Sequence, residues 1–182
     1  MANVFIFPVE DAAAGSTCGI PVAGGFDMES VLPFLIEKNQ IDYLGQIYPD
    51  GKCHPWGIPE IGENASLWNA MAKDDLVLGC RDASIVSAAY VWMKIRSPEL
   101  GARLWSGGVG EPFSLICFTD EPQWGDVPIV EQMTGYLDRD YRGFTKLAPE
   151  KRDNILRDYG SFETFVRLCL RFDFPFSFRH SE

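Results

Sequence analysis

The sequence has few of the residues on which enzymes and metal sites depend. Its 182 residues include only two histidines, His54 and His180, and no CxxC pair or His-rich cluster that would indicate zinc. The patterns GxxxxGK[ST], GxGxxG, HExxH and GxSxG are all absent. A Cys-His pair would need His54, and the adjacent Cys53 is a poor partner because neighbouring side chains tend to diverge. We therefore expect no catalytic residue, no metal and no cofactor.

Positive charge is also scarce, with 16 Lys and Arg against 26 Asp and Glu and a net charge of −10. Nonspecific nucleic-acid binding depends on basic side chains that release counterions from phosphates, so this balance argues against a chain that coats nucleic acid. Residues 139–182 are richer in basic groups, with nine basic and seven acidic side chains. The candidates for phosphate contacts are Arg81, Lys94, Arg96, Arg103, Arg139, Arg142 and Lys146.

Long apolar runs are missing too. No run approaches the roughly 18 residues that a membrane span requires, and the first residues lack the basic leader and apolar core of a signal peptide. The five cysteines are odd in number, widely spaced and mostly in apolar contexts, which indicates reduced thiols. We expect a cytoplasmic protein without a membrane partner.

The patterns that are present predict an α+β fold. Residues 4–9 form an apolar, β-branched and aromatic run typical of a strand, and similar runs follow at 75–81, 84–93 and 113–121. Helices are expected at 28–40, around 64–71, from Ser97–Pro98 onward, from Pro149 to Gly160, and after Ser161. The alternating phenylalanines of residues 172–178 predict a further strand.

Two tryptophans in residues 52–71 suggest different roles. Trp68 shares one helical face with Leu67 and Met71, which indicates a core residue. Trp56 lies between Pro55 and Gly57 in what we interpret as a rigid loop, either as core or as the wall of a binding site. Trp92 at the end of an apolar strand and Trp124 in the turn EPQWGD are interpreted as structural. Either could line the rim of a groove, but nothing in the sequence favours that role.

The chain presents a characteristic order of segments: VFIFPV, the PWG loop, Asn64, the helix around Trp68, DDLVLGCRD, SIVSAAYV, SPELGARLW and PFSLICFTDEP. This order resembles the PUA-like superfamily, which includes the YTH and EVE domains and the amino-terminal modified-DNA readers of McrBC-type restriction enzymes. The resemblance covers about residues 3–8 and 53–160, with 11–50 as an insertion in a single domain of residues 1–182. It implies a curved mixed sheet, or a partly closed barrel, of five to six strands flanked by short helices.

The resemblance also implies an aromatic cage for an extruded modified base. Its walls would be Trp56, Trp105 and either Val109 or Phe113, with Asn64 in the polar loop after the first wall. The first strand, which ends near Pro8, lends polar groups to the base edge in such domains. Here "FPVED" departs from the usual Lys-Ser-x-Asn pattern, so the base, methyladenine or a 5-substituted cytosine, stays open.

The function implied is recognition without catalysis. Flipping a base costs a few kcal/mol, and stacking on aromatic rings returns about 1–3 kcal/mol per base. The partner would be modified DNA, or less readily RNA, and a fused or associated NTPase or nuclease would supply the chemistry of a restriction or defence system. The alternative is a protein-interaction or small-ligand module on the same fold without nucleic-acid binding, which the acidity favours.

Overall fold

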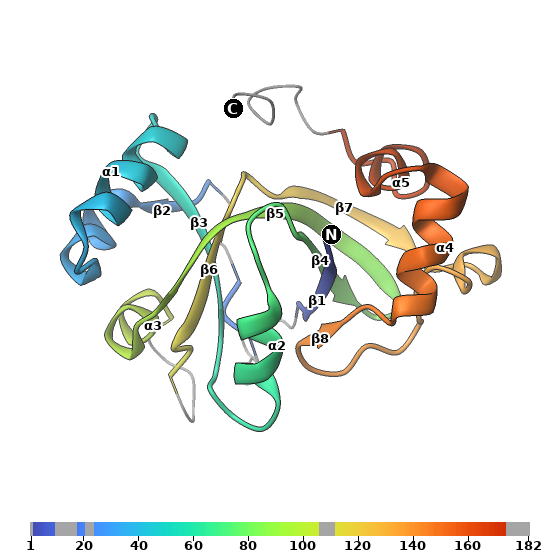
Figure 1. Cartoon of the computed structure of the whole chain (residues 1–182), viewed down its shortest axis with the longest axis horizontal. Helices are drawn as coiled ribbons and strands as arrows, with labels where there is room; N and C mark the ends of the chain where they lie inside the picture. Colours follow the sequence, from blue (N-terminus) through green and yellow to red (C-terminus); the bar gives the residue numbers. More distant parts are fainter. Residues whose placement is uncertain (1, 10–17, 21–23, 106–111, 174–182) are drawn as a thin grey trace.

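A curved, open sheet organises the molecule (Figure 1). The computed structural model describes residues 2–9, 18–20, 24–105 and 112–173. Its eight strands follow the order β2-β3-β6-β5-β4-β1-β8, and β7 pairs with β5. They are β1 (Val4–Pro8), β2 (Phe26–Asp27), β3 (Lys52–Ile58), β4 (Leu76–Arg81), β5 (Ser84–Arg96), β6 (Leu115–Thr119), β7 (Gln123–Pro128) and β8 (Thr145–Lys146). Within these ranges no pairing joins β2 to β8, so the sheet does not close into a barrel.

Helices lie at both ends of the sheet and near its middle (Figure 1). The 3₁₀ helices η1 (Met28–Ser30) and η2 (Leu32–Phe34) lead into α1 (Lys38–Ile47), and the others are α2 (Asn64–Ala70), α3 (Pro98–Leu104), η3 (Glu131–Met133), α4 (Pro149–Tyr159) and α5 (Phe162–Leu168). No helix among the described residues is long and apolar enough to cross a membrane. The predicted α+β class and mixed sheet are confirmed.

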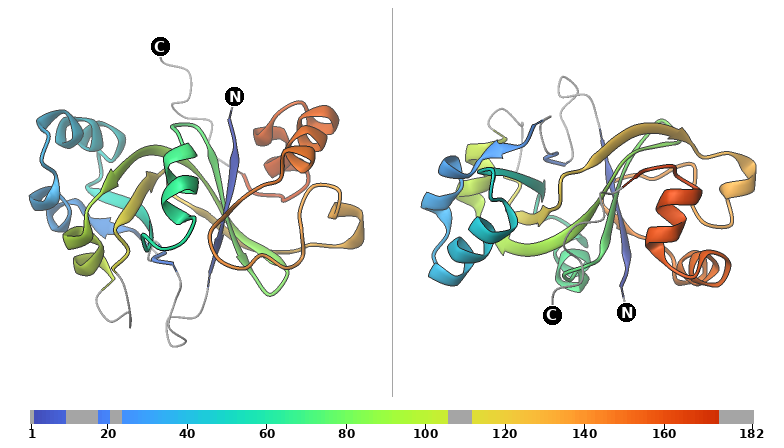
Figure 2. Two further views of the ribbon diagram at one scale, coloured as in Figure 1. Left: turned by 60° about the horizontal axis from the view of Figure 1, so that its bottom comes forward. Right: turned by 90° about the horizontal axis from the view of Figure 1, so that it is seen from above.

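The sheet turns about its longest strand, β5 (Figure 2). The first half of β5 pairs with β4 and β7, and the second half pairs with β6. All of these pairings are antiparallel, whereas β1 and β4 are parallel, with Val4 opposite Leu76. One strand therefore connects both halves of the sheet, and a residue on β5 can face side chains from several strands.

Three apolar clusters fill the space around the sheet. The central cluster contains Phe5, Phe7, Trp56 and Cys117 and is covered by residues of α2. A second cluster lies under α4 and α5, and a third lies under η1, η2, α1 and α3. Strand β1 shows why its sequence is continuously apolar, since Phe5 and Phe7 belong to the central cluster while Val4 and Ile6 belong to the second.

Helix boundaries follow the capping signals of the sequence. The Ser97 hydroxyl accepts a hydrogen bond from the Leu100 N–H at 3.2 Å and so caps α3. Pro149 begins α4, and Gly160 ends it in the left-handed region with φ of 76°. Ser161 caps α5 by accepting from the Thr164 N–H at 3.1 Å. These predictions are confirmed.

Other predictions are corrected. The helix expected at 28–40 is two 3₁₀ turns followed by α1. Pro33 has no N–H and would interrupt a continuous α-helix, whereas it is tolerated near the start of η2. The PWG segment lies within β3 rather than in a loop. The sheet has eight strands instead of five or six, since β2 and β8 have only two residues each and β7 lacks apolar alternation. Of the predicted strand at 172–178, positions 174–178 lie outside the described residues.

Candidate ligand-binding site

Trp56 is held rigidly in the central cluster. Its side chain is fully buried, and its indole Nε1 donates to the Thr119 hydroxyl at 3.2 Å. Phe7 packs edge-on against the ring, with 5.1 Å between centroids. The hydrogen bond fixes which way the indole points, and no part of the ring is exposed to solvent.

Trp105 lies on the opposite face of β3. A Cβ atom on Gly57 would come within 2.5 Å of the Trp105 ring, so this ring covers the face to which residue 57 points. Neighbouring residues of a strand point to opposite faces, and Trp56 therefore points away from Trp105. Trp105 is also tied down, because its Nε1 donates to the Ile20 carbonyl at 3.0 Å. The structure does not bring these two rings together as walls of one cage.

The other predicted cage residues are also dispersed. Phe113 is buried edge-on against Trp105, at 5.7 Å between centroids, and so belongs to the Trp105 side of β3. Asn64 donates from its amide nitrogen to the Pro59 carbonyl at 3.0 Å, which is a local contact within its own loop. Pro8 is opposite Cys80 on β4, while its neighbours in β1 contact the central cluster. Val109 lies outside the described residues.

The ring that does accompany Trp56 is Trp124 on β7. The two rings are nearly parallel, at 17°, with 6.4 Å between centroids, and Trp124 is 46% exposed. Rings in full face-to-face contact would have centroids about 3.5–4 Å apart. Trp124 is therefore displaced from full overlap with Trp56, and part of its aromatic surface is open to solvent.

The sequence predicts a turn at Trp124, but this residue lies in strand β7, which carries no apolar alternation and is exposed at most of its residues. The signal that was available is that a large aromatic residue stands among polar neighbours, in the segment QWGD. A large exposed aromatic is the more informative exception to the rule that such residues are buried. We define the tryptophan-pair site as Trp56 and Trp124 together with Gly79 on β4 and Ser87 on β5.

Small residues on β4 and β5 make room for the tryptophan-pair site. Ser87 on β5 is opposite Trp124 on β7 and also opposite Gly79 on β4. A Cβ atom on Gly79 would lie 2.2 Å from Ser87 Oγ, 2.8 Å from Val9 Cγ2 and 3.4 Å from Trp56 Cη2. The added Cβ would collide with Ser87 and Val9 and would be in ordinary van der Waals contact with Trp56, so the close approach of Ser87 and Val9 requires glycine here. These three side chains surround one point.

Three of the seven predicted basic residues gather around α2 instead. The Lys94 ammonium lies 4.5 Å from the Trp68 ring centroid and donates to the Trp68 carbonyl at 2.6 Å. Burial lowers the pKa of Lys94 from its usual value. Arg96 lies near the same ring and pairs with Glu60 at 3.1 Å. Lys146 is on β8, which contacts α2. These contacts support Trp68 as part of the packing.

Two further basic residues lie at the far end of β7. Arg81 is opposite Ser84 at the β4–β5 turn, and Ser84 in turn is opposite Pro128. Arg139 donates from Nε to the Ile129 carbonyl at 2.9 Å. Pro128 is four residue steps along the strand from Trp124, which corresponds to about 13 Å. Arg103 is exposed on α3, and Arg142 pairs with Asp140 at 3.1 Å.

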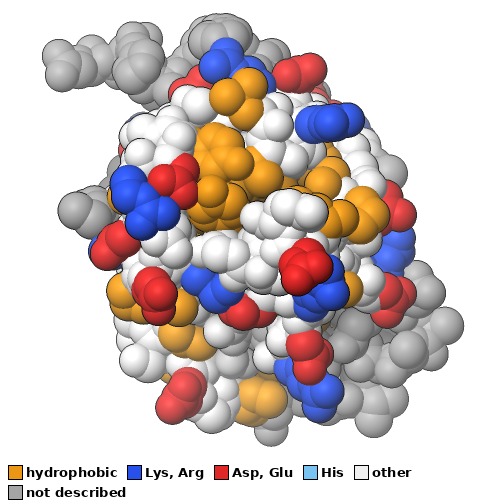
Figure 3. Space-filling view, turned by 90° about the vertical axis from the view of Figure 1, so that its right-hand side faces the viewer, with side chains coloured by type: hydrophobic (Ala, Val, Ile, Leu, Met, Phe, Trp, Pro, Cys, Tyr) orange, Lys and Arg blue, Asp and Glu red, His pale blue; other side chains and the backbone are white. Residues whose placement is uncertain are grey.

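Charges of both signs are mixed on the face that carries α4 and α5 (Figure 3). Hydrophobic side chains gather in its upper half, and Leu168 of α5 is an exposed hydrophobic residue. A face of this composition lacks the single positive field that phosphate binding needs. It does not resemble a nucleic-acid interface.

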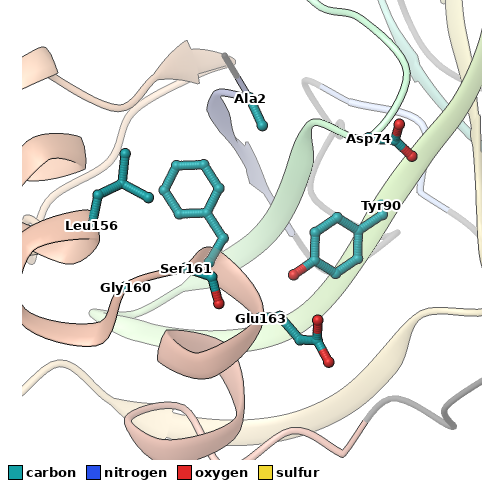
Figure 4. Close-up of a pocket in the computed structure, with 8 residues that line it drawn as sticks. Ala2, Asp74, Tyr90, Leu156, Gly160, Ser161 and Glu163 are labelled. Atoms are coloured by element: carbon teal, nitrogen blue, oxygen red, sulfur yellow. The ribbon is translucent and has the colours of Figure 1, made fainter. Parts of the chain in front are cut away.

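A separate cavity of about 280 Å³ lies between the α4–α5 pair and the sheet (Figure 4). Figure 4 shows Tyr90 and the carboxylates of Asp74 and Glu163 on one side and Leu156 on the other. No predicted site residue and no basic side chain lines it. Two carboxylates without a positive partner disfavour a phosphate, so this cavity is not a candidate for nucleic acid.

The cysteines contribute no reactive thiolate. Cys53, Cys80, Cys117 and Cys169 are free cysteines. Burial raises the pKa of Cys53 and of Cys117 to about 12 and that of Cys80 to about 11, so these thiols stay protonated near neutral pH. Among the described residues, no group of three or more His, Cys, Asp or Glu side chains is arranged to hold a metal ion.

Comparisons with protein-family models, with curated proteins and with solved structures find no match to this chain.

Proposed function

We propose that the protein binds a planar modified base, extruded from nucleic acid, by stacking it on the tryptophan-pair site. The observation that carries the proposal is the half-exposed Trp124 ring, which lies nearly parallel to the fully buried Trp56 ring. An exposed tryptophan leaves apolar surface in contact with water, which is unfavourable. A ligand stacked on the ring would remove that surface from water. Binding rather than catalysis is the activity proposed.

The architecture supports this function by analogy. The curved mixed sheet and its flanking helices are compatible with a PUA-like fold of the YTH and EVE type, which we propose for this chain. Fold alone does not determine function, so the argument depends on the site. Trp124 takes the place that the sequence assigned to Trp105, and Trp56 remains as a wall.

The energy available is sufficient for selective recognition. Stacking on one aromatic surface contributes about 1–3 kcal/mol per base, which is comparable to the few kcal/mol needed to extrude it. A buried methyl group adds roughly 0.8 kcal/mol. Because the hydrogen bond to Thr119 fixes Trp56, this side chain loses little conformational entropy when a ligand binds.

DNA is the proposed partner, with Arg81 and Arg139 as the phosphate contacts closest along β7. A separate NTPase or nuclease would supply any cleavage, which makes this chain a targeting module of a restriction or defence system. The salt dependence of binding tests the contacts, because each lost phosphate contact lowers the slope of log K against log salt by about 0.9. Arg103→Ala, a change on the other end of the sheet, is the matched control.

A second candidate is capture of a planar small ligand without nucleic acid. Glu121 and Asp126 are exposed close to Trp124 in the sequence, and carboxylates there disfavour a phosphodiester. Affinity for such a ligand would barely respond to salt, in contrast to DNA binding.

The decisive experiment compares Trp124→Ala with Trp105→Ala. Fluorescence anisotropy would measure affinity for matched duplexes that carry no modification, one N6-methyladenine, or one 5-methylcytosine. We expect Trp124→Ala to weaken binding of one modified duplex by about 1–3 kcal/mol and to affect the unmodified duplex far less. Trp105→Ala should leave the discrimination unchanged. The proposal is wrong if folded Trp124→Ala discriminates as the parent protein does, or if the parent protein binds none of the duplexes.

A further inference from the structure

Ser87 is a buried hydroxyl without a partner. Its side chain is fully buried, and Oγ has no hydrogen-bond partner among the described residues. Thr119, equally buried, shows the usual situation, since its hydroxyl accepts from Trp56 and lies within hydrogen-bond distance of two carbonyls. An unsatisfied buried hydroxyl opposes folding. Such a group in a native structure calls for an explanation.

Its position connects Ser87 to the tryptophan-pair site. It occupies the register position between Gly79 and Trp124, and its Oγ lies on the side of β5 where Trp56 and Val9 approach Gly79. A hydroxyl can both donate and accept one hydrogen bond, so it suits an exocyclic amine as well as a ring nitrogen or a carbonyl. These are the groups on the edge of a heteroaromatic base.

We infer that the Ser87 hydroxyl is the specificity-determining group of the tryptophan-pair site and hydrogen-bonds to the edge of the planar ring that stacks there. The inference rests on the proposed function and identifies the ligand chemistry more narrowly: a planar heterocycle with a polar edge. Trp124 stands on β7, whose only described pairing is with β5, and its ring is half-exposed. Because Ser87 is fully buried, the inference requires this ring to move so that the ligand edge can enter. Trp56 stays in place.

The test is Ser87→Ala, with Ser84→Ala on the same strand as the matched control. The probes are the three duplexes above, together with N6-methyladenine and 5-methylcytosine as free bases. We expect Ser87→Ala to bind the preferred probe roughly three- to tenfold more weakly, the effect of one neutral hydrogen bond, while Ser84→Ala binds as the parent protein does. Thermal unfolding is measured alongside, and the midpoint of Ser87→Ala should stay level or rise.

The outcomes separate this inference from the proposed function. Loss of binding in Trp124→Ala with unchanged affinity in Ser87→Ala overturns the role of Ser87 and leaves the stacking site standing. A lower unfolding midpoint in Ser87→Ala, beyond that of Ser84→Ala, also overturns it, because the hydroxyl would then have a structural partner. If the parent protein binds none of the duplexes and neither free base, the inference is overturned together with the proposed function.

Discussion

The two faces of β3 at residues 56 and 57 use tryptophan in opposite ways. On one face Trp56 is fully buried, yet its neighbour Trp124 leaves an aromatic surface open. On the other face Trp105 closes over a bridge between Gly19 and Gly57 and is fixed by a hydrogen bond to Ile20. Adjacent residues of one strand thus support a candidate binding surface and a packing seal.

The difference shows that the type of residue alone does not distinguish a binding wall from a core residue. Both tryptophans have a hydrogen-bonded indole nitrogen, and both contact a second aromatic ring, Phe7 or Phe113. The two tryptophans differ in the exposure of a neighbouring ring, since Trp124 beside Trp56 is half-exposed and Phe113 beside Trp105 is buried.

Trp56→Ala should have the largest effect on stability. Removing a fully buried tryptophan leaves a cavity in the central cluster, and we expect a loss of about 3–5 kcal/mol in the free energy of unfolding. Urea denaturation measures it. Trp124→Ala is the control, since its half-exposed ring should cost much less. Equal losses in the two variants would mean that both rings are core residues.

Gly57→Ala should break the seal on the other face. Its Cβ would lie 2.5 Å from the Trp105 ring, so the ring must move, at a cost of about 1–3 kcal/mol. Gly45→Ala in α1 is the control, because no atom lies within 4 Å of its Cβ position and alanine favours a helix by up to about 1 kcal/mol. In a Trp105→Ala background the cost of Gly57→Ala should fall; full additivity would exclude the contact.

His54, two residues before Trp56, should make stability depend on pH. Burial lowers its pKa, and the nearby carboxylates of Glu121 and Asp50 only partly oppose this shift. The unfolded state then binds the proton more tightly, with a pKa near 6.5, so the stability present above about pH 6.5 is lost as the pH falls toward the lower folded pKa.

The measurement is the free energy of unfolding from pH 7.5 to 5.0 for the parent protein and for His54→Gln. One proton contributes a slope of at most about 1.4 kcal/mol per pH unit. The parent protein should lose more stability than the variant over this range. Parallel pH profiles would show that His54 is not desolvated, despite an Nδ1 that has no hydrogen-bond partner among the described residues.

Ser97→Ala should have the smallest effect, on the helix that carries Trp105. Loss of the cap leaves the Leu100 N–H without its side-chain acceptor, at a cost of about 1 kcal/mol. Ser66→Ala, on the exposed side of α2, should change stability by less than about 0.5 kcal/mol. Thermal unfolding of the two variants compares them, and equal midpoints would contradict a role for this cap.

Local patterns predicted much of the fold because they act over a few residues. The apolar runs of β1, β4, β5 and β6 and the caps at Ser97, Gly160 and Ser161 were all visible in the sequence. The structures around two prolines were harder to predict, because Pro33 divides a helix pattern and Pro55 lies within a strand.

The candidate site depended on contacts that no local pattern records. The face to which Trp105 turns is decided by the bridge between Gly19 and Gly57, and Gly19 lies in a segment rich in Ala, Gly and Ser without periodicity. Trp124 meets Trp56 only because β7 pairs with the first half of β5 while β3 reaches β5 through β6. Strand order and the turn of β5 therefore had to be known first.

The parallel pairing of β1 with β4 has a consequence during protein synthesis. Asn3 and Asp75, which are hydrogen-bonded at the start of this pair, are 72 residues apart in the chain. At about 5–20 residues per second, β1 leaves the ribosome on the order of 4–14 seconds before β4. Its residues 4–7, which precede Pro8, have high β-propensity and no charge, and these properties favour aggregation when a segment is exposed. Nascent chains stalled before β4 should therefore depend on chaperones more than chains released after it.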